Sequence, residues 1–246
     1  MGSDPIILAI DAGNTRVKWG VRDGGRWSAL GAVETAQAAG VAKGWPKLPP
    51  QTRAIASNVA GTEAAARLSA ACRERHLELA FIAALDGELG VINGYRHPGQ
   101  LGPDRWAALV AAHHGGRGHK LVVNAGTALT IDALGADGRF RGGMIVPGPA
   151  LMRRSLDRGT AALREAPGAI EAFPASTPDA IATGAIQACV GAVERMRSTM
   201  SAHGLAPATI VLSGGAAPEL APHLPPPVAI DENLVLEGLV LIARNC

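Results

Sequence analysis

Residues 6–20 combine an apolar run with a polar turn whose groups could bind a phosphate. Ile6 to Ile10 form a continuous apolar stretch, Asp11 and the turn 13–15 follow, and the chain then alternates again. This pattern predicts a buried strand, a tight reversal and a second strand, which together form a β-hairpin. Its tip presents a carboxylate, backbone N–H groups, a hydroxyl and an amide, which could hold a phosphate and a metal. By itself, the pattern fits an ordinary hairpin equally well.

A second stretch repeats this design in the other half of the chain. Residues 121–132 form an apolar strand, then Asn124, Ala-Gly, the hydroxyl of Thr127 and an alternating strand. The segment 11–13 aligns with 124–126. Two phosphate-binding hairpins predict two related domains that face each other across a nucleotide cleft.

The predicted strands and helices around these hairpins follow one another in a similar order in the two halves of the chain. The first half predicts strands at 27–35, 54–59 and 77–82 and helices at 36–44, 62–75 and 105–114, with an irregular connection at 90–105. The second predicts strands at 139–146, 209–213 and 228–230 and helices at 151–164, 178–203 and 233–244, with Thr177 as N-cap of the long helix. A glycine-rich linker at 115–118 separates domains 1–115 and 116–246. The fold class is therefore α/β with a duplicated architecture, and neither a dinucleotide-binding nor a Walker phosphate motif is present.

The amino-acid composition is typical of a globular protein. The chain has 246 residues, 48% hydrophobic content, a net charge of +2 and only 3% aromatic residues. These values predict a globular protein that binds neither nucleic acid nor membrane. The three widely spaced cysteines form no disulfide framework, so we expect a soluble, cytoplasmic protein.

The two hairpins resemble the phosphate loops of the actin-like ATPase and sugar kinase superfamily, whose domains are ribonuclease-H-like. Three further segments narrow the resemblance to the type III pantothenate kinases. They are Tyr95 to Trp106, similar to Y-x-x-P-x-x-L-G-x-D-R-W; Gly142 to Gly148, similar to G-G-x-I-x-P-G; and Thr177 to Gly184, similar to T-x-x-A-I-x-x-G, with Ser176 in place of the usual Asn. These matches span nearly the whole chain in order.

The resemblance implies a role for each matching residue. The residues expected to bind ATP are Asp11, Ala12, Gly13, Asn14, Thr15, Arg16, Val17, Lys18 and Thr127, with Asp11 also serving Mg²⁺. Those expected to bind pantothenate are Tyr95, Gly102, Pro103, Asp104, Arg105 and Thr177, with Thr177 reaching the site of a neighbouring subunit in a homodimer that shares its active sites. The pair Gly214-Gly215 would lie near adenosine.

The chemistry suits these residue types. Phosphoryl transfer needs positioning and charge neutralisation, and the acceptor alcohol needs a base, for which Asp104 is the catalytic candidate. Arg105 could pair with the pantothenate carboxylate. The alternatives are that Asp104 only caps a helix, that Arg105 forms a surface salt bridge, and that Thr177 only caps its own helix.

Asn124 departs from the family pattern, which has Asp there to help bind a monovalent cation. A neutral amide lacks the charge that strengthens such a site, so we expect weak or no activation by K⁺ or NH₄⁺. The function expected is ATP-dependent phosphorylation of pantothenate to 4′-phosphopantothenate, the first step of coenzyme A biosynthesis. The alternatives are a kinase of another small hydroxylated substrate and a regulatory relative without turnover.

Overall fold

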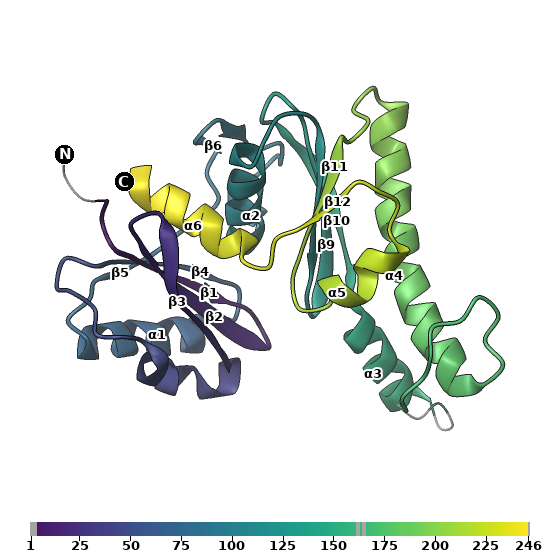
Figure 1. The fold of residues 1–246 in the computed structure, drawn as a ribbon, viewed down its shortest axis with the longest axis horizontal. Coiled ribbons are helices and arrows are strands. Elements are labelled where there is room, and N and C mark those ends of the chain that lie inside the picture. The colour runs from purple at the N-terminus through teal and green to yellow at the C-terminus, as the bar shows by residue number, and fades with distance from the viewer. Residues whose placement is uncertain (1–3, 161–162, 164–165, 246) are drawn as a thin grey trace. The chain divides into compact units, whose positions relative to one another are not determined.

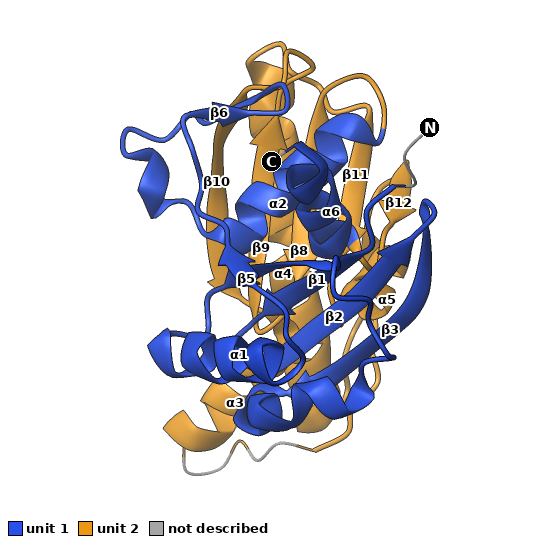
Figure 2. Ribbon diagram, turned by 90° about the vertical axis from the view of Figure 1, so that its left-hand side faces the viewer, with its two compact units in different colours: residues 1–115, 234–246 blue, residues 116–233 orange. Residues whose placement is uncertain are grey.

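The computed structural model describes residues 4–160, 163 and 166–245, and the chain divides into two compact units. Unit 1 comprises Met1–Gly115 and Leu234–Cys246, and unit 2 comprises Gly116–Asn233 (Figure 2). The sequence analysis placed all of 116–246 in the second domain. The structure differs at the C-terminal helix, which belongs to unit 1.

Unit 1 is built on a five-stranded sheet with the order β3-β2-β1-β4-β5. Its strands are β1 (Ile7–Ala12), β2 (Arg16–Asp23), β3 (Arg26–Glu34), β4 (Arg53–Asn58) and β5 (Leu79–Phe81). The first three form an antiparallel meander, and β4 pairs in parallel with β1 and β5. The expected hairpin is β1–β2, and the apolar run of β1 is fully buried, as a central strand requires.

Helices cover both faces of this sheet. On one face, η1 (Thr35–Gly44), a 3₁₀ helix where the sequence predicted a short helix, and α1 (Thr62–Glu74) enclose a core with Leu8, Ile10 and Trp19. On the other face lie α2 (Pro103–His114) and α6 (Leu234–Asn245), as Figure 1 shows. Between β5 and α2, the expected irregular connection contains a small ribbon of β6 (Gly87–Glu88) and β7 (Val91–Ile92) and one turn of 3₁₀ helix, η2 (Pro98–Gln100).

Close packing explains why α6 joins unit 1. A Cβ atom at Gly238 would lie 1.9 Å from the carbonyl oxygen of Ala107, so the absence of a side chain lets α6 and α2 approach very closely. Glu237 accepts hydrogen bonds from Arg22 Nη1 at 2.8 Å and from Trp27 Nε1 at 2.7 Å. These contacts tie α6 to the strands β2 and β3, and no local sequence signal specifies them.

Unit 2 repeats the sheet with the order β10-β9-β8-β11-β12. Its strands are β8 (Lys120–Ala125), β9 (Ala128–Leu134), β10 (Phe140–Pro147), β11 (Thr209–Ser213) and β12 (Val228–Ile230). Its helices are α3 (Pro149–Gly159), α4 (Thr177–Ala202), α5 (Ala217–Leu220) and η3 (Ala221–His223). The identical strand order confirms the duplicated α/β architecture. The helix predicted at 151–164 begins at Pro149 and ends earlier, at Gly159, with Thr160 as an extended C-cap; residues 161, 162, 164 and 165 lie outside the described residues.

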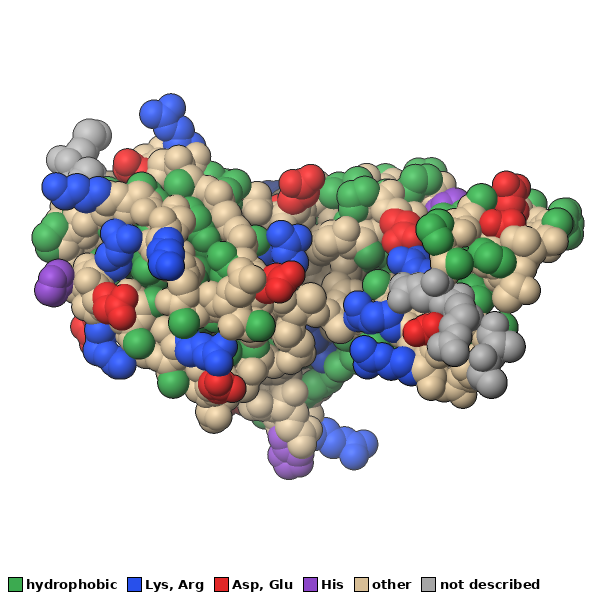
Figure 3. Space-filling model, turned by 90° about the horizontal axis from the view of Figure 1, so that it is seen from below, with side chains coloured by type: hydrophobic (Ala, Val, Ile, Leu, Met, Phe, Trp, Pro, Cys, Tyr) green, Lys and Arg blue, Asp and Glu red, His purple; other side chains and the backbone are tan. Residues whose placement is uncertain are grey.

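None of the described helices is both long and apolar enough to span a membrane. On the face drawn in Figure 3, acidic and basic side chains are interspersed rather than gathered by sign. The cysteines Cys72 and Cys189 are buried and free, and Cys246 lies outside the described residues.

Candidate active site

Three polar side chains form a row across the first sheet where β1 and β4 end. Asp11 lies opposite Lys18 of β2 on one side and opposite Ser57 of β4 on the other. Directly opposed residues of neighbouring strands share a face, so all three side chains point the same way. Ser57 is fully buried, and its Oγ donates a hydrogen bond of 2.7 Å to Asp11 Oδ1. The sequence analysis missed Ser57, although the strand predicted at 54–59 was the available signal.

The turn between β1 and β2 is held from the end of β3. Gly13 N donates to the carbonyl oxygen of Arg16 at 3.0 Å, and Thr35 Oγ1 donates to the carbonyl oxygen of Gly13 at 2.7 Å. Thr35 N also donates to the carbonyl oxygen of Thr15 at 3.0 Å. The side chains of Asn14, Thr15 and Arg16 are exposed. The turn therefore has a fixed backbone and accessible polar side chains.

Asp104 occupies the second position of α2, whose N-cap is Gly102. Asp104 is therefore not the N-cap residue, but its Oδ1 accepts from the first-turn N–H of Arg105 at 2.8 Å, so the carboxylate does bind the start of the helix. A Cβ atom at Gly102 would lie 2.6 Å from that same oxygen. The glycine thus leaves room for the carboxylate just where Pro103 begins the helix.

The carboxylate of Asp104 is close enough to Asp11 to influence the pKa of Asp11. Burial raises the pKa of Asp11 from 3.8 to about 6; the Ser57 hydrogen bond opposes the shift, the charge of Asp104 adds to it, and Lys18 opposes it. Burial also raises the pKa of Asp104, against the opposing effects of the Arg105 backbone N–H and guanidinium. The fold therefore brings together two partly buried carboxyl groups whose pKa values are both raised.

This donor set suits a divalent cation that is shared with a phosphorylated ligand. Mg²⁺ prefers hard oxygen ligands and typically takes one or two carboxylates together with substrate phosphates and water. Asp11 supplies such an oxygen next to the fixed turn. Among the described residues, no group of three or more His, Cys, Asp or Glu side chains could form an all-protein metal cage.

Arg105 is a buried cation beside the carboxylate of Asp104. It is only 4% exposed, so the alternative of a surface salt bridge is wrong. Its Nη1 donates to Tyr95 Oη at 3.0 Å, and its guanidinium carbon lies 5.6 Å from the centre of the Tyr95 ring. The next residue, Trp106, donates from Nε1 to Glu88 Oε2 at 3.0 Å. The predicted site residues Tyr95 and Arg105 thus contact each other at the start of α2.

In unit 2 the second hairpin gathers the other glycine motifs. A Cβ atom at Gly148 would lie 2.1 Å from the carbonyl oxygen of Gly126, and one at Gly214 would lie 2.4 Å from that of Ala125. Gly148 N donates to the carbonyl oxygen of Thr127 at 2.8 Å. The turn 126–127 therefore packs directly against Gly148, and the preceding residue Ala125 packs against Gly214, at distances that no side chain would permit.

The polar row of the first sheet has a counterpart here. Asn124 lies opposite Thr130 of β9 and opposite Ser213 of β11. Its position in the sheet matches that of Asp11, but an amide replaces the carboxylate. The row in unit 2 is thus neutral, whereas the row in unit 1 carries charge.

The start of α4 differs from the expected arrangement in one residue. Ser176 is the N-cap, and its Oγ accepts from Asp179 N at 3.3 Å, so the expectation that Thr177 caps the helix is wrong. Thr177 is exposed in the first turn. The small residues Ala180, Gly184, Ala188 and Gly191 are exposed as well. Among the described residues, nothing lies within 4 Å of a Cβ atom built at either glycine.

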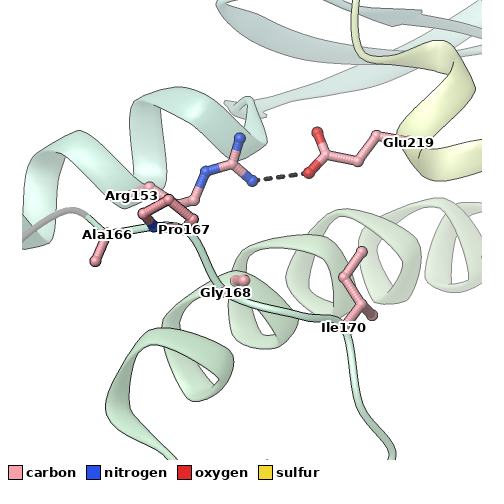
Figure 4. A pocket seen from close by; sticks show the side chains of 7 residues that line it. Arg153, Ala166, Pro167, Gly168, Ile170 and Glu219 are labelled. Carbon is pink, nitrogen blue, oxygen red and sulfur yellow. Dashed lines mark hydrogen bonds and ion pairs between the residues drawn. The ribbon is translucent and has the colours of Figure 1, made fainter.

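Unit 2 also contains a cavity of about 390 Å³ that the sequence analysis did not predict (Figure 4). Its lining residues are Arg153, Ala166, Pro167, Gly168, Ile170, Ala182 and Glu219. Arg153 and Glu219 form an ion pair of 2.9 Å at its wall. None of the predicted site residues lines it.

Solved structures resemble this fold at low sequence identity. One is described as a candidate 2-dehydro-3-deoxygalactonokinase from Sinorhizobium meliloti, with a TM-score of 0.64, 16% identity and coverage of 97% of this chain and 98% of that one. Another, described as a candidate Baf family transcriptional activator from Campylobacter jejuni, has a TM-score of 0.61, 20% identity and coverage of 97% and 98%. These likenesses show the fold alone, which is the two-domain actin-like ATPase and sugar kinase fold.

Sequence comparisons identify the family. A family model described as type III pantothenate kinase matches residues 7–199. The type III pantothenate kinase of Aromatoleum aromaticum is 46% identical over 240 residues, covering 98% of each chain. That of Nitrosospira multiformis is 42% identical over 242 residues, covering 98% of this chain and 92% of the relative. The chain therefore belongs to the type III pantothenate kinase family.

Proposed function

We propose that this protein transfers the γ-phosphoryl group of ATP to the primary hydroxyl of pantothenate, giving 4′-phosphopantothenate, in the cytoplasm. The observation that carries this proposal is the meeting of Asp11, Asp104 and Arg105 at one end of the first sheet in a member of this family. This set supplies a phosphate and metal ligand, a base and a buried cation. Those are the groups that phosphoryl transfer to a carboxylate-bearing alcohol requires.

The experiment is a phosphorylation assay with the purified protein, ATP and Mg²⁺. Pantothenate is compared with a neutral analogue whose carboxylate is replaced by an amide, and with unrelated small alcohols. Turnover of pantothenate well above the neutral analogue supports the proposal. Preferred turnover of another alcohol would make the protein a kinase of a different substrate, and no turnover of any would favour the regulatory alternative.

The ATP phosphates are assigned to the turn from Asp11 to Lys18, and Asp11 also binds Mg²⁺. The fixed turn backbone supports this role, because preorganised polar groups stabilise the charge that spreads over the transferring phosphoryl group. Bound Mg²⁺ would neutralise phosphate charge. Thr127 is assigned as a further phosphate ligand, and Gly214-Gly215 to the adenosine; both assignments rest on the sequence motifs and on their packing within unit 2.

Asp104 is assigned as the base that accepts the proton of the pantothenate hydroxyl. Its raised pKa makes the carboxylate a better proton acceptor than an ordinary aspartate. Its position is set by the space at Gly102 and by the Arg105 backbone N–H. Tyr95, Gly102, Pro103 and Arg105 are assigned to the substrate. The guanidinium of Arg105, already oriented by Tyr95 Oη, would pair with the pantothenate carboxylate.

The active unit is assigned as a homodimer with shared sites. The small residues of α4 are exposed along one stripe, so they do not serve packing within the chain as described. Small residues permit close approach of a second helix, and twofold contacts are the commonest oligomer interface. Because Ser176 is the N-cap of α4, Thr177 does not serve that role, and its side chain would reach pantothenate in the site of the partner subunit.

A further inference from the structure

The segment before α2 that carries Tyr95 is organised around the side chain of Asn93, which is only 7% exposed. Asn93 Nδ2 donates to the carbonyl oxygen of Leu85 at 3.1 Å and to that of Pro98 at 3.2 Å. Its Oδ1 accepts from Tyr95 N at 3.1 Å. One buried amide thus holds the beginning, the middle and the end of the segment 85–98.

Regular structure contributes little to this segment. The ribbon of β6 and β7 has two residues in each strand, and η2 has three. The backbone of Asn93 adds one bond, from its N to the carbonyl oxygen of Asp86 at 2.9 Å. The side chain of Asn93 therefore supplies hydrogen bonds that a longer strand pair would otherwise provide.

These bonds continue toward the active site. Asn93 fixes the backbone of Tyr95, and Tyr95 Oη accepts from Arg105 Nη1 at 3.0 Å. Arg105 is next to Asp104 at the start of α2. A displacement of the Tyr95 backbone would therefore move the phenol that orients the Arg105 guanidinium.

Only an amide serves all of these partners. An alanine at position 93 would leave two carbonyl oxygens and one N–H without this partner, and an unpaired buried polar group is unfavourable. An aspartate would keep the acceptor for Tyr95 N but place a carboxylate against the carbonyl oxygens of Leu85 and Pro98.

We propose that Asn93 is a positioning residue for pantothenate: it sets the affinity for this substrate by holding Tyr95, and through Tyr95 the guanidinium of Arg105. This inference rests on the proposed function, in which Tyr95 and Arg105 bind pantothenate. Asn93 itself does not contact the substrate.

The test compares Asn93→Ala, Asn93→Asp and Tyr95→Ala with the double variant Asn93→Ala/Tyr95→Ala. Gln100→Ala is the matched control, since it removes an exposed amide from the same segment. The KM for pantothenate should rise about ten-fold in Asn93→Ala and at least as much in Asn93→Asp, given the cost of unpaired buried groups. The kcat and the KM for ATP should stay near those of the wild type, the Tm should fall because buried hydrogen bonds are lost, and Gln100→Ala should match the wild type throughout.

The double variant separates positioning from independent effects. If Asn93 acts through Tyr95, Asn93→Ala should raise the pantothenate KM less than about two-fold when Tyr95 is already alanine. Fully multiplicative effects would overturn the proposal. Asn93→Ser keeps one hydroxyl that can donate and accept, so its KM should be intermediate, and it supplies the test if Asn93→Ala does not fold.

The remaining outcomes distinguish a failure of the role proposed for Asn93 from a failure of the proposed pantothenate site. An unchanged pantothenate KM in the Asn93 variants, with a raised KM in Tyr95→Ala, would overturn the role of Asn93 and leave the proposed site intact. An unchanged KM in Tyr95→Ala would overturn the assignment of the site itself. A parallel fall in kcat, ATP affinity and Tm in every Asn93 variant would show a general structural role and also overturn the proposal.

Discussion

Ser57 donates a hydrogen bond of 2.7 Å to Asp11, across 46 positions of sequence, and still does not offset the burial of that carboxylate. The pKa of Asp11 rises to about 6 because burial and the charge of Asp104 together outweigh Ser57 and Lys18. The folded protein thus carries an unfavourable charge at neutral pH. Such strain in a binding site typically lowers stability in exchange for function.

Replacing Asp11 by Asn should therefore stabilise the metal-free protein at pH 7. A shift from 3.8 to about 6 corresponds to about 3 kcal/mol at most, so we expect a gain of about 2–3 kcal/mol in the free energy of unfolding. Because the folded pKa lies above the unfolded value, the carboxyl stabilises the fold below about pH 4, and this contribution is lost as the pH rises through about 6. The gain should thus be largest at pH 7 and disappear near pH 4.

Urea unfolding of wild type and Asp11→Asn at both pH values measures this difference. Asp23→Asn, an exposed carboxyl at the end of β2, is the control and should change little. Equal or lower stability of Asp11→Asn at pH 7 would contradict the assigned burial of the charge. The same variant should lose phosphoryl transfer if Asp11 binds Mg²⁺.

Asp104→Asn should lower turnover by roughly 10²-fold or more while pantothenate still binds. The amide keeps the acceptor for Arg105 N, so the geometry is preserved and only the basicity is removed. Steady-state kinetics give the turnover, and calorimetry gives the binding of pantothenate. Turnover near that of the wild type would exclude Asp104 as the base.

Gly102→Ala should displace the Asp104 carboxylate without unfolding the protein. The new Cβ atom would lie 2.6 Å from Asp104 Oδ1, and misplacement of a reacting group by about 1 Å can cost about 10²-fold in rate. We expect kcat to fall by about ten-fold or more. Gly99→Ala is the matched control, because a Cβ atom there meets nothing within 4 Å among the described residues. Equal kcat values for the two variants would show that the position of Asp104 is not limiting.

Activation by K⁺ or NH₄⁺ should be weak or absent in the wild type and should increase in Asn124→Asp. The reason is that the row of Thr130, Asn124 and Ser213 is neutral, and a carboxylate would add the charge that a hard-cation site needs. Activity is measured in Na⁺, K⁺ and NH₄⁺ salts at equal ionic strength. Strong dependence of the wild type on K⁺ would mean that other groups supply the cation site.

Mixed dimers test whether the active sites are shared. Asp104→Asn and Thr177→Val are each prepared, shown to be folded and impaired, and then mixed under conditions of subunit exchange. If Thr177 serves the partner's site, each mixed dimer has one site with both defects and one with neither. Activity should then recover toward half per mixed dimer. Proven exchange without recovery would place Thr177 in its own chain's site or outside any site.

The local pattern was sufficient for the elements whose signals lie within a few residues. The hairpin around Asp11, its repeat around Asn124 and the strand 209–213 were predicted because buried strands and tight turns have short-range signatures. The duplicated architecture followed from recognising that the two hairpins are copies, whereas the order of the strands within each sheet came from the structure. The start of α4 was predicted to within one residue, and the error lay in choosing between Ser176 and Thr177, since both are good N-caps.

Only the tertiary structure decided which distant residues meet. Ser57 reaches Asp11 because β4 pairs in parallel with β1, and pairing between strands that are far apart in sequence leaves no local trace. Arg105 and Asn93 are polar types that usually lie at the surface, so their burial depends on partners that the fold supplies. The sequence alone determined the family and the candidate groups, whereas burial and long-range pairing determined their ionisation and their neighbours.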